Sequence, residues 1–495
     1  MTFVNRISEQ ERLKKALSRN VSAFVVLYGR RRCGKSRLIR QVLTFGDCYF
    51  MADQSEATQQ RILLAKTLGA VIESFDKVTY PDWETLFETL NLRLNKRITL
   101  CLDEFPYLVK TAPELASVIQ KLMDKKDSLN FNLLLCGSSQ QLMHGLVFDR
   151  TAPLFGRADE IMKIKPMKAV YLQEILKTTA VETIEEYSVW GGIPRYWELR
   201  LTENTLFEAL EYHLFNSQGI LYDEPVRLFL DDMRDTVHSF TILSLIAAGC
   251  NRLSEIAARL EKPATHLSAP IEKLLMLGYI ERIVPFDENP KNSKKSLYKI
   301  ADPFLNFYFR FVVPNRSFIE IEQTNVIINR IKEQFAGYVS WHWEKLCREA
   351  VPFLSINGVN FNVASNYWGT PTKDKPVEID VVAESQDGKY LLVGECKWQD
   401  KMLDSQQLLT GLTEKATVLP FAKNKTIIPV LFLKNKTQYK NEKNIFFPDD
   451  ILKMLKELET KPGYFLSNTG ECKDYTISCN GLSLEDMRFE KNTNR

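Results

Sequence analysis

The feature that most constrains the fold is a loop near the amino terminus, with the sequence Gly29-Arg30-Arg31-Arg32-Cys33-Gly34-Lys35-Ser36. It follows the apolar run 24–28, which is typical of a strand, and precedes residues 37–43, whose apolar positions recur at helical spacing. In that setting, the pattern G-x-x-x-x-G-K-[ST] predicts a phosphate-binding P-loop rather than a plain glycine turn. The two glycines allow consecutive N–H groups to converge on an anion, and the helix adds its positive N-terminus.

The loop residues have separate expected roles toward a nucleotide and its magnesium ion. Lys35 is expected to reach the β- and γ-phosphates, and the Ser36 hydroxyl is expected to ligate Mg²⁺. The other loop residues and the first residue after the loop are expected to line the bound cofactor: Gly29, Arg30, Arg31, Arg32, Cys33, Gly34 and Arg37.

A second apolar run, residues 97–104, ends in the acids Asp103 and Glu104. A continuous apolar run suits a buried parallel strand, and ligands of such sheets gather at the carboxyl ends of the strands. We therefore expect Asp103 to contribute to the cofactor site by holding Mg²⁺, directly or through water. Glu104 is expected to orient and polarise the attacking water.

Two further segments supply candidates for sensing or stabilising the transferred phosphoryl group. The apolar run 131–139 ends in Ser138 and Ser139, either of which is placed to hydrogen-bond the γ-phosphate; a simple turn after a strand is the alternative. Arg157, in the loop segment 153–157, is predicted to stabilise charge on the transferring group, within its own chain or in a neighbouring subunit. An ordinary surface arginine is the alternative there.

Six short motifs occur in the order seen in the archaeal-type ATPase family, which belongs to the AAA+/STAND class of P-loop NTPases: FVNRxxE, GRRRCGKS, LCLDEFPYL, LLLCGSS, PLFGR and GGIPRYW. This resemblance covers residues 1 to about 220. It implies ATP rather than GTP, and a switch rather than a fast motor. It also implies that Val4 and Arg6 of the first motif, and Pro194 of the last, flank the adenine. A proline after glycines offers a rigid apolar edge to a purine ring.

Residues 230–312 carry a winged-helix pattern. Segments 240–249, 253–260 and 263–277 read as three helices, and 282–285 with 295–300 read as a hairpin. Two interpretations stay open. In one, the third helix enters a DNA major groove, and Lys291, Lys294 and Lys295 of the hairpin contact phosphates. In the other, this segment is an internal lid over the nucleotide, since His266 and Lys273 are the only obvious base contacts on that helix.

The strands 376–383 and 390–398 place Asp380 opposite a Glu395-x-Lys397 sequence. This arrangement resembles the D…E-x-K motif of the PD-(D/E)xK nuclease superfamily, and Glu344 stands on an upstream helix where such proteins often carry an acid. The region also resembles the DUF234 domain, through Tyr367-Trp368-Gly369 and GECKW.

The spacing of these residues gives the predicted C-terminal site its chemistry. Glu395 and Lys397 lie two residues apart and so share a strand face. Asp380 and Glu395 are expected to hold Mg²⁺, while Lys397 positions or activates water for attack on a phosphate. The alternative is a degenerate nuclease fold that is used for DNA binding or dimer contacts.

The expected fold class is α/β, and the length of 495 residues predicts about three domains. We expect a P-loop ATPase of AAA+/STAND type at 1–225, a winged helix at 226–315, a PD-(D/E)xK-like α/β domain at 316–460 and a polar element at 461–495.

Composition limits the expected cellular location of the protein but does not identify its partner. With 65 basic and 62 acidic residues, any nucleic-acid surface must be local. The nine cysteines form no CxxC pair, which is typical of a reducing compartment, and the five dispersed histidines argue against a His-based zinc site. The amino-terminal sequence lacks the apolar core of a signal peptide, and no long apolar run occurs. We expect a cytoplasmic location and no membrane partner.

Two functions remain in competition at this point. The first is an ATP-hydrolysing switch whose nucleotide state controls a C-terminal DNA-binding or nuclease-like module. The second is a signalling or assembly ATPase that binds protein partners and cleaves nothing. Expected ligands are ATP or ADP with Mg²⁺, while DNA and a second copy of the chain are partners left open.

Overall fold

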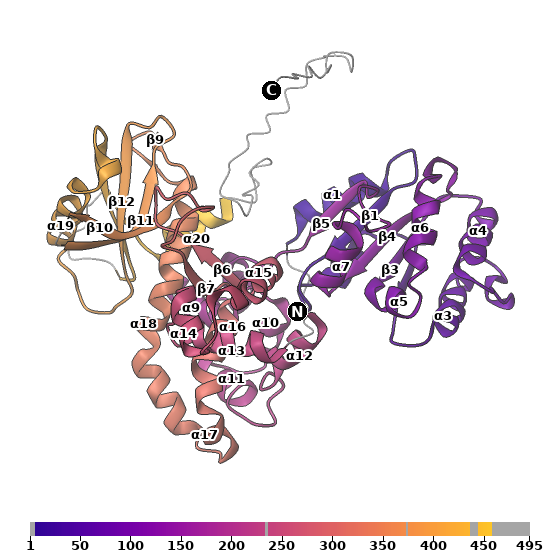
Figure 1. The fold of residues 1–495 in the computed structure, drawn as a ribbon, viewed down its shortest axis with the longest axis horizontal. Helices are drawn as coiled ribbons and strands as arrows, with labels where there is room; N and C mark the ends of the chain where they lie inside the picture. The colour runs from indigo at the N-terminus through magenta and orange to yellow at the C-terminus, as the bar shows by residue number, and fades with distance from the viewer. Residues whose placement is uncertain (1–4, 233–235, 373–374, 436–443, 458–495) are drawn as a thin grey trace.

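The computed structural model describes residues 5–232, 236–372, 375–435 and 444–457. Figure 1 shows an indigo and purple sheet at one side of the molecule, an orange sheet at the other, and helices between them. Among the described residues, no helix is long and apolar enough to cross a bilayer. Val4 and the expected polar element 461–495 lie outside the described residues.

The N-terminal sheet has five parallel strands in the order β2-β3-β4-β1-β5. Both β3 and β4 are buried along their whole length, which explains their continuous apolar sequences. The strands are β1 (Phe24–Tyr28), β2 (Cys48–Met51), β3 (Ile98–Asp103), β4 (Phe131–Gly137) and β5 (Glu160–Lys163). Its helices are α1 (Ile7–Leu17), α2 (Lys35–Val42), α3 (Ala57–Gly69), α4 (Trp83–Arg93), α5 (Phe105–Thr111), α6 (Leu115–Met123) and α7 (Gln140–Val147).

A helical segment follows the sheet. Its helices α9 and α11 each begin with a capping box, in which a threonine and a glutamate three residues later bond each other's backbone N–H groups. The segment contains α8 (Ala169–Leu176), α9 (Ala180–Trp190), α10 (Pro194–Arg200), α11 (Leu206–His213) and α12 (Glu224–Asp232).

Three helices and a hairpin come next, as the sequence predicts. They are α13 (Thr236–Ala247), α14 (Leu253–Arg259), α15 (Ser268–Leu277), β6 (Ile280–Ile283) and β7 (Leu297–Ile300). Gly278 ends α15 in the left-handed conformation, with a φ of 73°, and leads directly into the hairpin.

Helix α18 (Thr324–Ala350) connects this middle region to the C-terminal sheet. Its Tyr338 hydroxyl donates to the Ser188 carbonyl of α9 at 2.8 Å, and its Trp343 indole donates to the Phe432 carbonyl at 3.1 Å. Two shorter helices precede it, α16 (Pro303–Phe307) and α17 (Arg316–Glu320). One helix is therefore anchored in both regions.

The C-terminal sheet has the order β10-β11-β12-β13-β14. Strands β10, β11 and β12 are antiparallel neighbours, whereas β13 runs parallel to β12 and β14 parallel to β13. The elements are β10 (Ser365–Thr372), β11 (Lys375–Glu384), β12 (Tyr390–Lys397), α19 (Ser405–Thr417), β13 (Thr426–Leu433), β14 (Ile445–Phe446) and α20 (Pro448–Glu457); a separate small pair is β8 (Ser355–Ile356) and β9 (Val359–Asn360).

Candidate nucleotide site

Two loop positions after β1 require glycine. A Cβ on Gly29 would lie 2.4 Å from the Ile164 carbonyl oxygen, and Gly34 has a φ of 87°. Helix α2 then begins without a side-chain cap. The N–H groups of its first turn have no acceptor within the helix, so the loop presents backbone N–H donors at a positive helix end. An anion fits this arrangement.

Lys35 and Ser36 lie at the same helix end. The buried Lys35 ammonium donates to the carbonyls of Gly29 at 2.8 Å and Arg30 at 3.0 Å. The Ser36 hydroxyl donates to Asp103 Oδ2 at 2.6 Å. An ammonium, a hydroxyl and a carboxylate are thus gathered at one edge of the sheet, which is the donor set that a magnesium triphosphate requires.

Asp103 is 1% exposed, and four donors surround its carboxylate. Besides Ser36, the Tyr49 hydroxyl bonds Oδ2 at 2.5 Å, and the Glu104 N–H bonds Oδ1 at 2.9 Å. Burial alone would raise the pKa of Asp103, but hydrogen bonds from the Cys136 thiol, Ser36 and Tyr49 outweigh it and lower that pKa. The group is therefore an ionised carboxylate at neutral pH.

Glu104 is held by Ser138, which stands at the end of the adjacent strand. The Ser138 hydroxyl lies 2.7 and 2.9 Å from the two carboxylate oxygens of Glu104. Glu104 has a positive φ of 53°, a conformation that costs on the order of 1 kcal/mol for a residue with a side chain. Ser139 instead caps α7 by accepting from the Leu142 N–H at 3.4 Å. Of the two serines, Ser138 is the one beside Glu104.

Arg6 and the Gly192–Pro194 segment meet beside the loop. The Arg6 guanidinium donates to the carbonyls of Cys33 at 3.2 Å and Lys165 at 2.6 Å. The Met167 N–H donates to the Gly192 carbonyl at 2.7 Å, and a Cβ on Gly192 would lie 2.0 Å from the Met167 oxygen. Residues 165–167 therefore join the two motifs expected to flank the adenine.

Most loop arginine side chains are directed to acids outside the loop. Arg30 is buried, bonds Asp302 at 2.7 Å and lies 5.3 Å from the ring centre of Tyr279. The remaining pairs are Arg32 with Glu224 at 2.5 Å and Arg37 with Glu198 at 2.9 Å, while Arg31 is exposed. The side chains of Arg30 and Arg32 are thus engaged by acids outside the loop.

Arg157 lies near the amino-terminal ends of the parallel strands, whereas the P-loop follows the carboxyl-terminal end of β1. It pairs with Asp124 at 3.0 Å, and two residues later Asp159 accepts the N–H of Phe24, the first residue of β1. The five residues of β1 separate the start of that strand from the P-loop by roughly 16 Å. This geometry is incompatible with a contact between Arg157 and the P-loop of its own chain, so a neighbouring copy is the remaining setting for the predicted role.

The residues predicted on the C-terminal sheet come together. Asp380 Oδ2 accepts the Cys396 N–H at 2.8 Å, and Glu395 accepts from Lys397 at 2.7 Å and from Lys415 at 3.2 Å. Burial and the nearby Glu395 raise the pKa of Asp380. Burial also acts to raise the pKa of Glu395, but the hydrogen bond from Lys397 and the two lysine charges lower it.

Glu344 of α18 lies near these residues, and Glu344, Asp380 and Glu395 are called the acidic cluster below. Burial, followed by the charge of Asp380, raises its pKa to about 7, while Arg348 at 3.7 Å opposes the shift. Lys299 of β7 also acts on Glu344 electrostatically. Within the described residues, no three acidic, histidine or cysteine side chains converge as a ready metal cage. The sequence did not indicate Arg348 and Lys299 as members.

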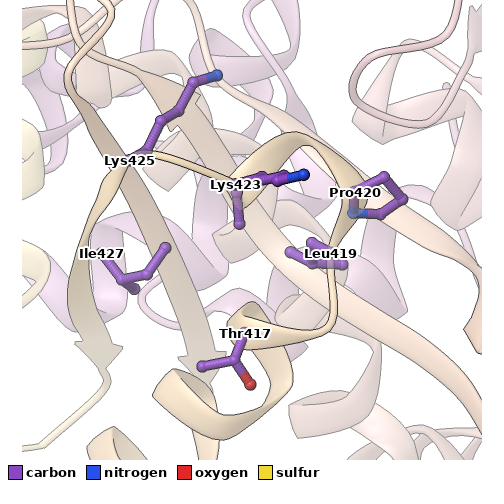
Figure 2. Close-up of a pocket in the computed structure, with 7 residues that line it drawn as sticks. Thr417, Leu419, Pro420, Lys423, Lys425 and Ile427 are labelled. Atoms are coloured by element: carbon purple, nitrogen blue, oxygen red, sulfur yellow. The ribbon is translucent and has the colours of Figure 1, made fainter.

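An open pocket of about 440 Å³ lies between the end of α19 and the start of β13 (Figure 2). Its lining includes Lys423 and Lys425, and Lys425 is already paired with Glu384 at 2.9 Å. Ile427 in its wall is six residues before Leu433, the β13 partner of Lys397. The pocket is thus at the other end of the sheet from the acidic cluster.

The chain is similar to known proteins in two separate regions. Residues 3–199 match an ATPase domain found predominantly in Archaea, and residues 308–409 match DUF234, described as archaeal and bacterial proteins of unknown function. The uncharacterized protein MJECL04 of Methanocaldococcus jannaschii is 29% identical over 426 residues, which is 84% of this chain and 92% of the relative.

Two solved structures are similar to part of the chain. The Walker-type ATPase PABY2304 of Pyrococcus abyssi has a TM-score of 0.48 and 22% identity, over 62% of this chain and 96% of that one. The ORC2 protein of Aeropyrum pernix has a TM-score of 0.43 and 14% identity, over 65% and 97%. With the site geometry, the two matches lead to one conclusion: the chain has an N-terminal P-loop domain of the archaeal ATPase type, followed by a region that matches DUF234.

Proposed function

We propose that this protein is an ATP-dependent switch in which nucleotide binding at the P-loop controls the C-terminal DUF234 region. We propose three regions, 1–225, 226–315 and 316–460. The middle region couples the conformation of the first region to that of the third. The hairpin β6–β7 carries the proposal, because Asp302 just after it pairs with Arg30 of the P-loop and its Glu281 pairs with Lys345, the neighbour of Glu344 in α18.

The nucleotide side holds the hairpin at its base. Arg30 reaches Asp302, two residues after β7, and lies against Tyr279, the residue before β6. Gln140, two residues after Ser138, donates to the Leu277 carbonyl at the end of α15 at 2.8 Å. The loop and the Ser138 segment would both touch the phosphates. Both also contact residues at the base of the hairpin, namely Leu277, Tyr279 and Asp302.

The C-terminal side holds the centre of the hairpin. Glu281 of β6 accepts twice from Lys345 of α18, at 2.9 Å each, and it is the cross-strand partner of Lys299. Lys345 is the neighbour of Glu344, on which Lys299 also acts. A shift at the base of the hairpin is thereby linked through two lysines to the acidic cluster.

The proposed ATPase chemistry assigns one role to each side chain. Bound Mg·ATP would supply the phosphoryl group for transfer to water. Lys35 binds the phosphates, Ser36 and Asp103 hold the metal ion, and Glu104 orients the water, with Ser138 fixing the direction of Glu104. Arg6 and Pro194 flank the base, in keeping with the contacts of Arg6 and Gly192 beside the loop.

For the C-terminal region, we propose a nuclease-like module that acts on nucleic acid. Support comes from the meeting of Glu344, Asp380, Glu395 and Lys397, which are two candidate metal ligands, a further acid and a lysine. The helix–helix–helix–hairpin order of residues 236–300 suits a winged helix, with Lys291, Lys294 and Lys295 exposed on the hairpin.

A second candidate function is a signalling or assembly ATPase with a non-cleaving C-terminal fold. The observation that favours it is the state of Glu395, whose two oxygens are each taken by a lysine. A carboxylate paired in this way loses much of its attraction for a cation.

The nucleotide assignment is tested by two substitutions with different expected effects. Lys35→Ala removes the charge that meets the phosphates and is expected to abolish ATP binding in titration calorimetry. Glu104→Gln keeps the size of the side chain and is expected to retain binding while losing hydrolysis. Equal ATP affinity in the wild type and Lys35→Ala contradicts the assignment.

A further inference from the structure

We infer that Tyr49 is a positioning residue for ATP hydrolysis, acting by holding the carboxylate of Asp103. Its hydroxyl and that of Ser36 donate to the same oxygen, Asp103 Oδ2, at 2.5 and 2.6 Å. Nothing in the motif pattern marks Tyr49, since it is one apolar-looking position of a short strand. The inference rests on the proposed role of Asp103 as a metal-holding residue.

The register of the sheet explains why this tyrosine reaches the carboxylate. Strand β2 runs parallel to β3, and Tyr49 is the direct partner of Cys101, two residues before Asp103. The Arg40 guanidinium of α2 lies 4.9 Å from the centre of the Tyr49 ring and packs over its face. Burial, and after it the bond to Asp103, raises the pKa of Tyr49, so the hydroxyl keeps its proton and remains a donor at neutral pH.

The distribution of donors gives Tyr49 a task that its neighbours do not share. Ser36 is itself an expected metal ligand, so its hydroxyl oxygen has a second task once a metal ion is present. The Glu104 N–H fixes the other oxygen, Oδ1, and the Cys136 thiol is a weaker donor than a hydroxyl. Tyr49 therefore supplies the hydroxyl bond that keeps Oδ2 in place without itself being a ligand. Hydrogen-bond partners of metal ligands typically contribute 10–100-fold to metal affinity or activity.

The test is a magnesium titration of ATPase activity in the full chain at saturating ATP. Tyr49→Phe is expected to raise the Mg²⁺ concentration for half-maximal turnover about tenfold and to lower kcat about tenfold. The KM for ATP at saturating Mg²⁺ should stay within about twofold.

The matched control is Tyr80→Phe, which removes another hydroxyl bond of the same domain, from Tyr80 to the Phe75 carbonyl at 3.0 Å. It is expected to leave the magnesium requirement unchanged. If Tyr49→Phe behaves like this control, the inference is overturned.

Two further variants separate the causes of a negative result. Asp103→Asn with undiminished hydrolysis would refute the proposed metal role of Asp103, whatever Tyr49 does. If Tyr49→Phe no longer binds ATP in EDTA, it has lost the folded site, and Tyr49→Gln, which retains a donor, takes its place. A Tyr49→Gln variant that binds ATP in EDTA should keep the magnesium requirement within about threefold of the wild type. A tenfold rise there would contradict the inference.

Discussion

Arg30 shows how one side chain ties the phosphate-binding loop to a distant part of the chain. Its guanidinium is 6% exposed and its partner Asp302 is 4% exposed. Removing one member of such a pair leaves a buried charge without compensation, at a cost of about 3–5 kcal/mol. The Arg30 Nε atom has no partner, so Asp302 and the Tyr279 ring provide the compensation seen for this charge. A movement of the loop that separates this pair therefore carries an energetic cost.

The proposed role of Arg157 is tested by a single substitution. If it completes the site of a neighbouring copy, Arg157→Ala should lower turnover by about 10³-fold with little change in ATP affinity. Mixing Arg157→Ala with Lys35→Ala should then restore activity, because one copy provides the intact loop and the other provides the arginine. The control is Asp124→Asn, which releases the 3.0 Å pair but keeps the arginine. Unchanged turnover in Arg157→Ala would mark it as a surface residue.

Residues with local signals were predictable, and residues defined by long-range contacts were not. Gly29, Gly34, Lys35 and Ser36 belong to one short motif whose chemistry follows from spacing. The partner of Arg30 is 272 positions away, so no local pattern points to Asp302. Tyr49 likewise owes its position to strand pairing, which a sequence pattern does not report.

In the proposed switch, transmission depends on the hairpin β6–β7. Its two strands have four residues each, and its central cross-strand pair is Glu281 with Lys299. The base of the hairpin touches Arg30, whereas this central pair faces α18. A two-stranded element without a third strand is marginally stable alone. Its geometry is therefore set by the groups that hold it from both sides.

The C-terminal sheet gives a metal-binding prediction. Asp380→Ala and Glu395→Ala should each abolish Mn²⁺ binding and any cleavage of DNA or RNA, since hard oxygen ligands hold hard cations. Lys397→Ala should abolish cleavage but leave the metal bound, because an ammonium is no ligand. ATPase activity without nucleic acid should survive all three changes. Absence of bound Mn²⁺ at millimolar concentration in the wild type would favour the non-cleaving alternative.

Elements with a clear apolar pattern were predictable, including the short edge strand β2, whereas two strands with a weaker pattern were not. The apolar runs of β1, β3 and β4 are long enough to identify, and α14 and α15 have helical spacing. Strand β5 has four residues with one buried, so it carries little hydrophobic signal. Strand β10 was missed for a related reason, because its sequence SNYWGTPT mixes polar residues with glycine and proline.

On the scale of the whole molecule, the three regions share one apolar core. A single cluster includes Leu27 and Leu38 at the nucleotide site, Trp343 of α18 and Phe432 of the C-terminal sheet. Packed interiors transmit displacement because they contain few voids. The continuity of this core could not be predicted from the sequence, because it depends on contacts between residues far apart in sequence. Figure 1 shows α18 running from the helical middle region to the orange sheet.

The central claim is that nucleotide at the P-loop changes the C-terminal region through β6–β7, and hydrogen exchange tests it most directly. Adding a slowly hydrolysed ATP analogue to the wild type should change amide exchange both around residues 29–36 and in peptides covering β11 and β12. Glu281→Gln, which weakens the grip on Lys345, should bind the analogue with unchanged affinity but lose the change in β11 and β12. The control Glu84→Gln releases only an exposed pair with Lys121 and should behave as the wild type. Protection confined to the P-loop region in the saturated wild type would contradict the account.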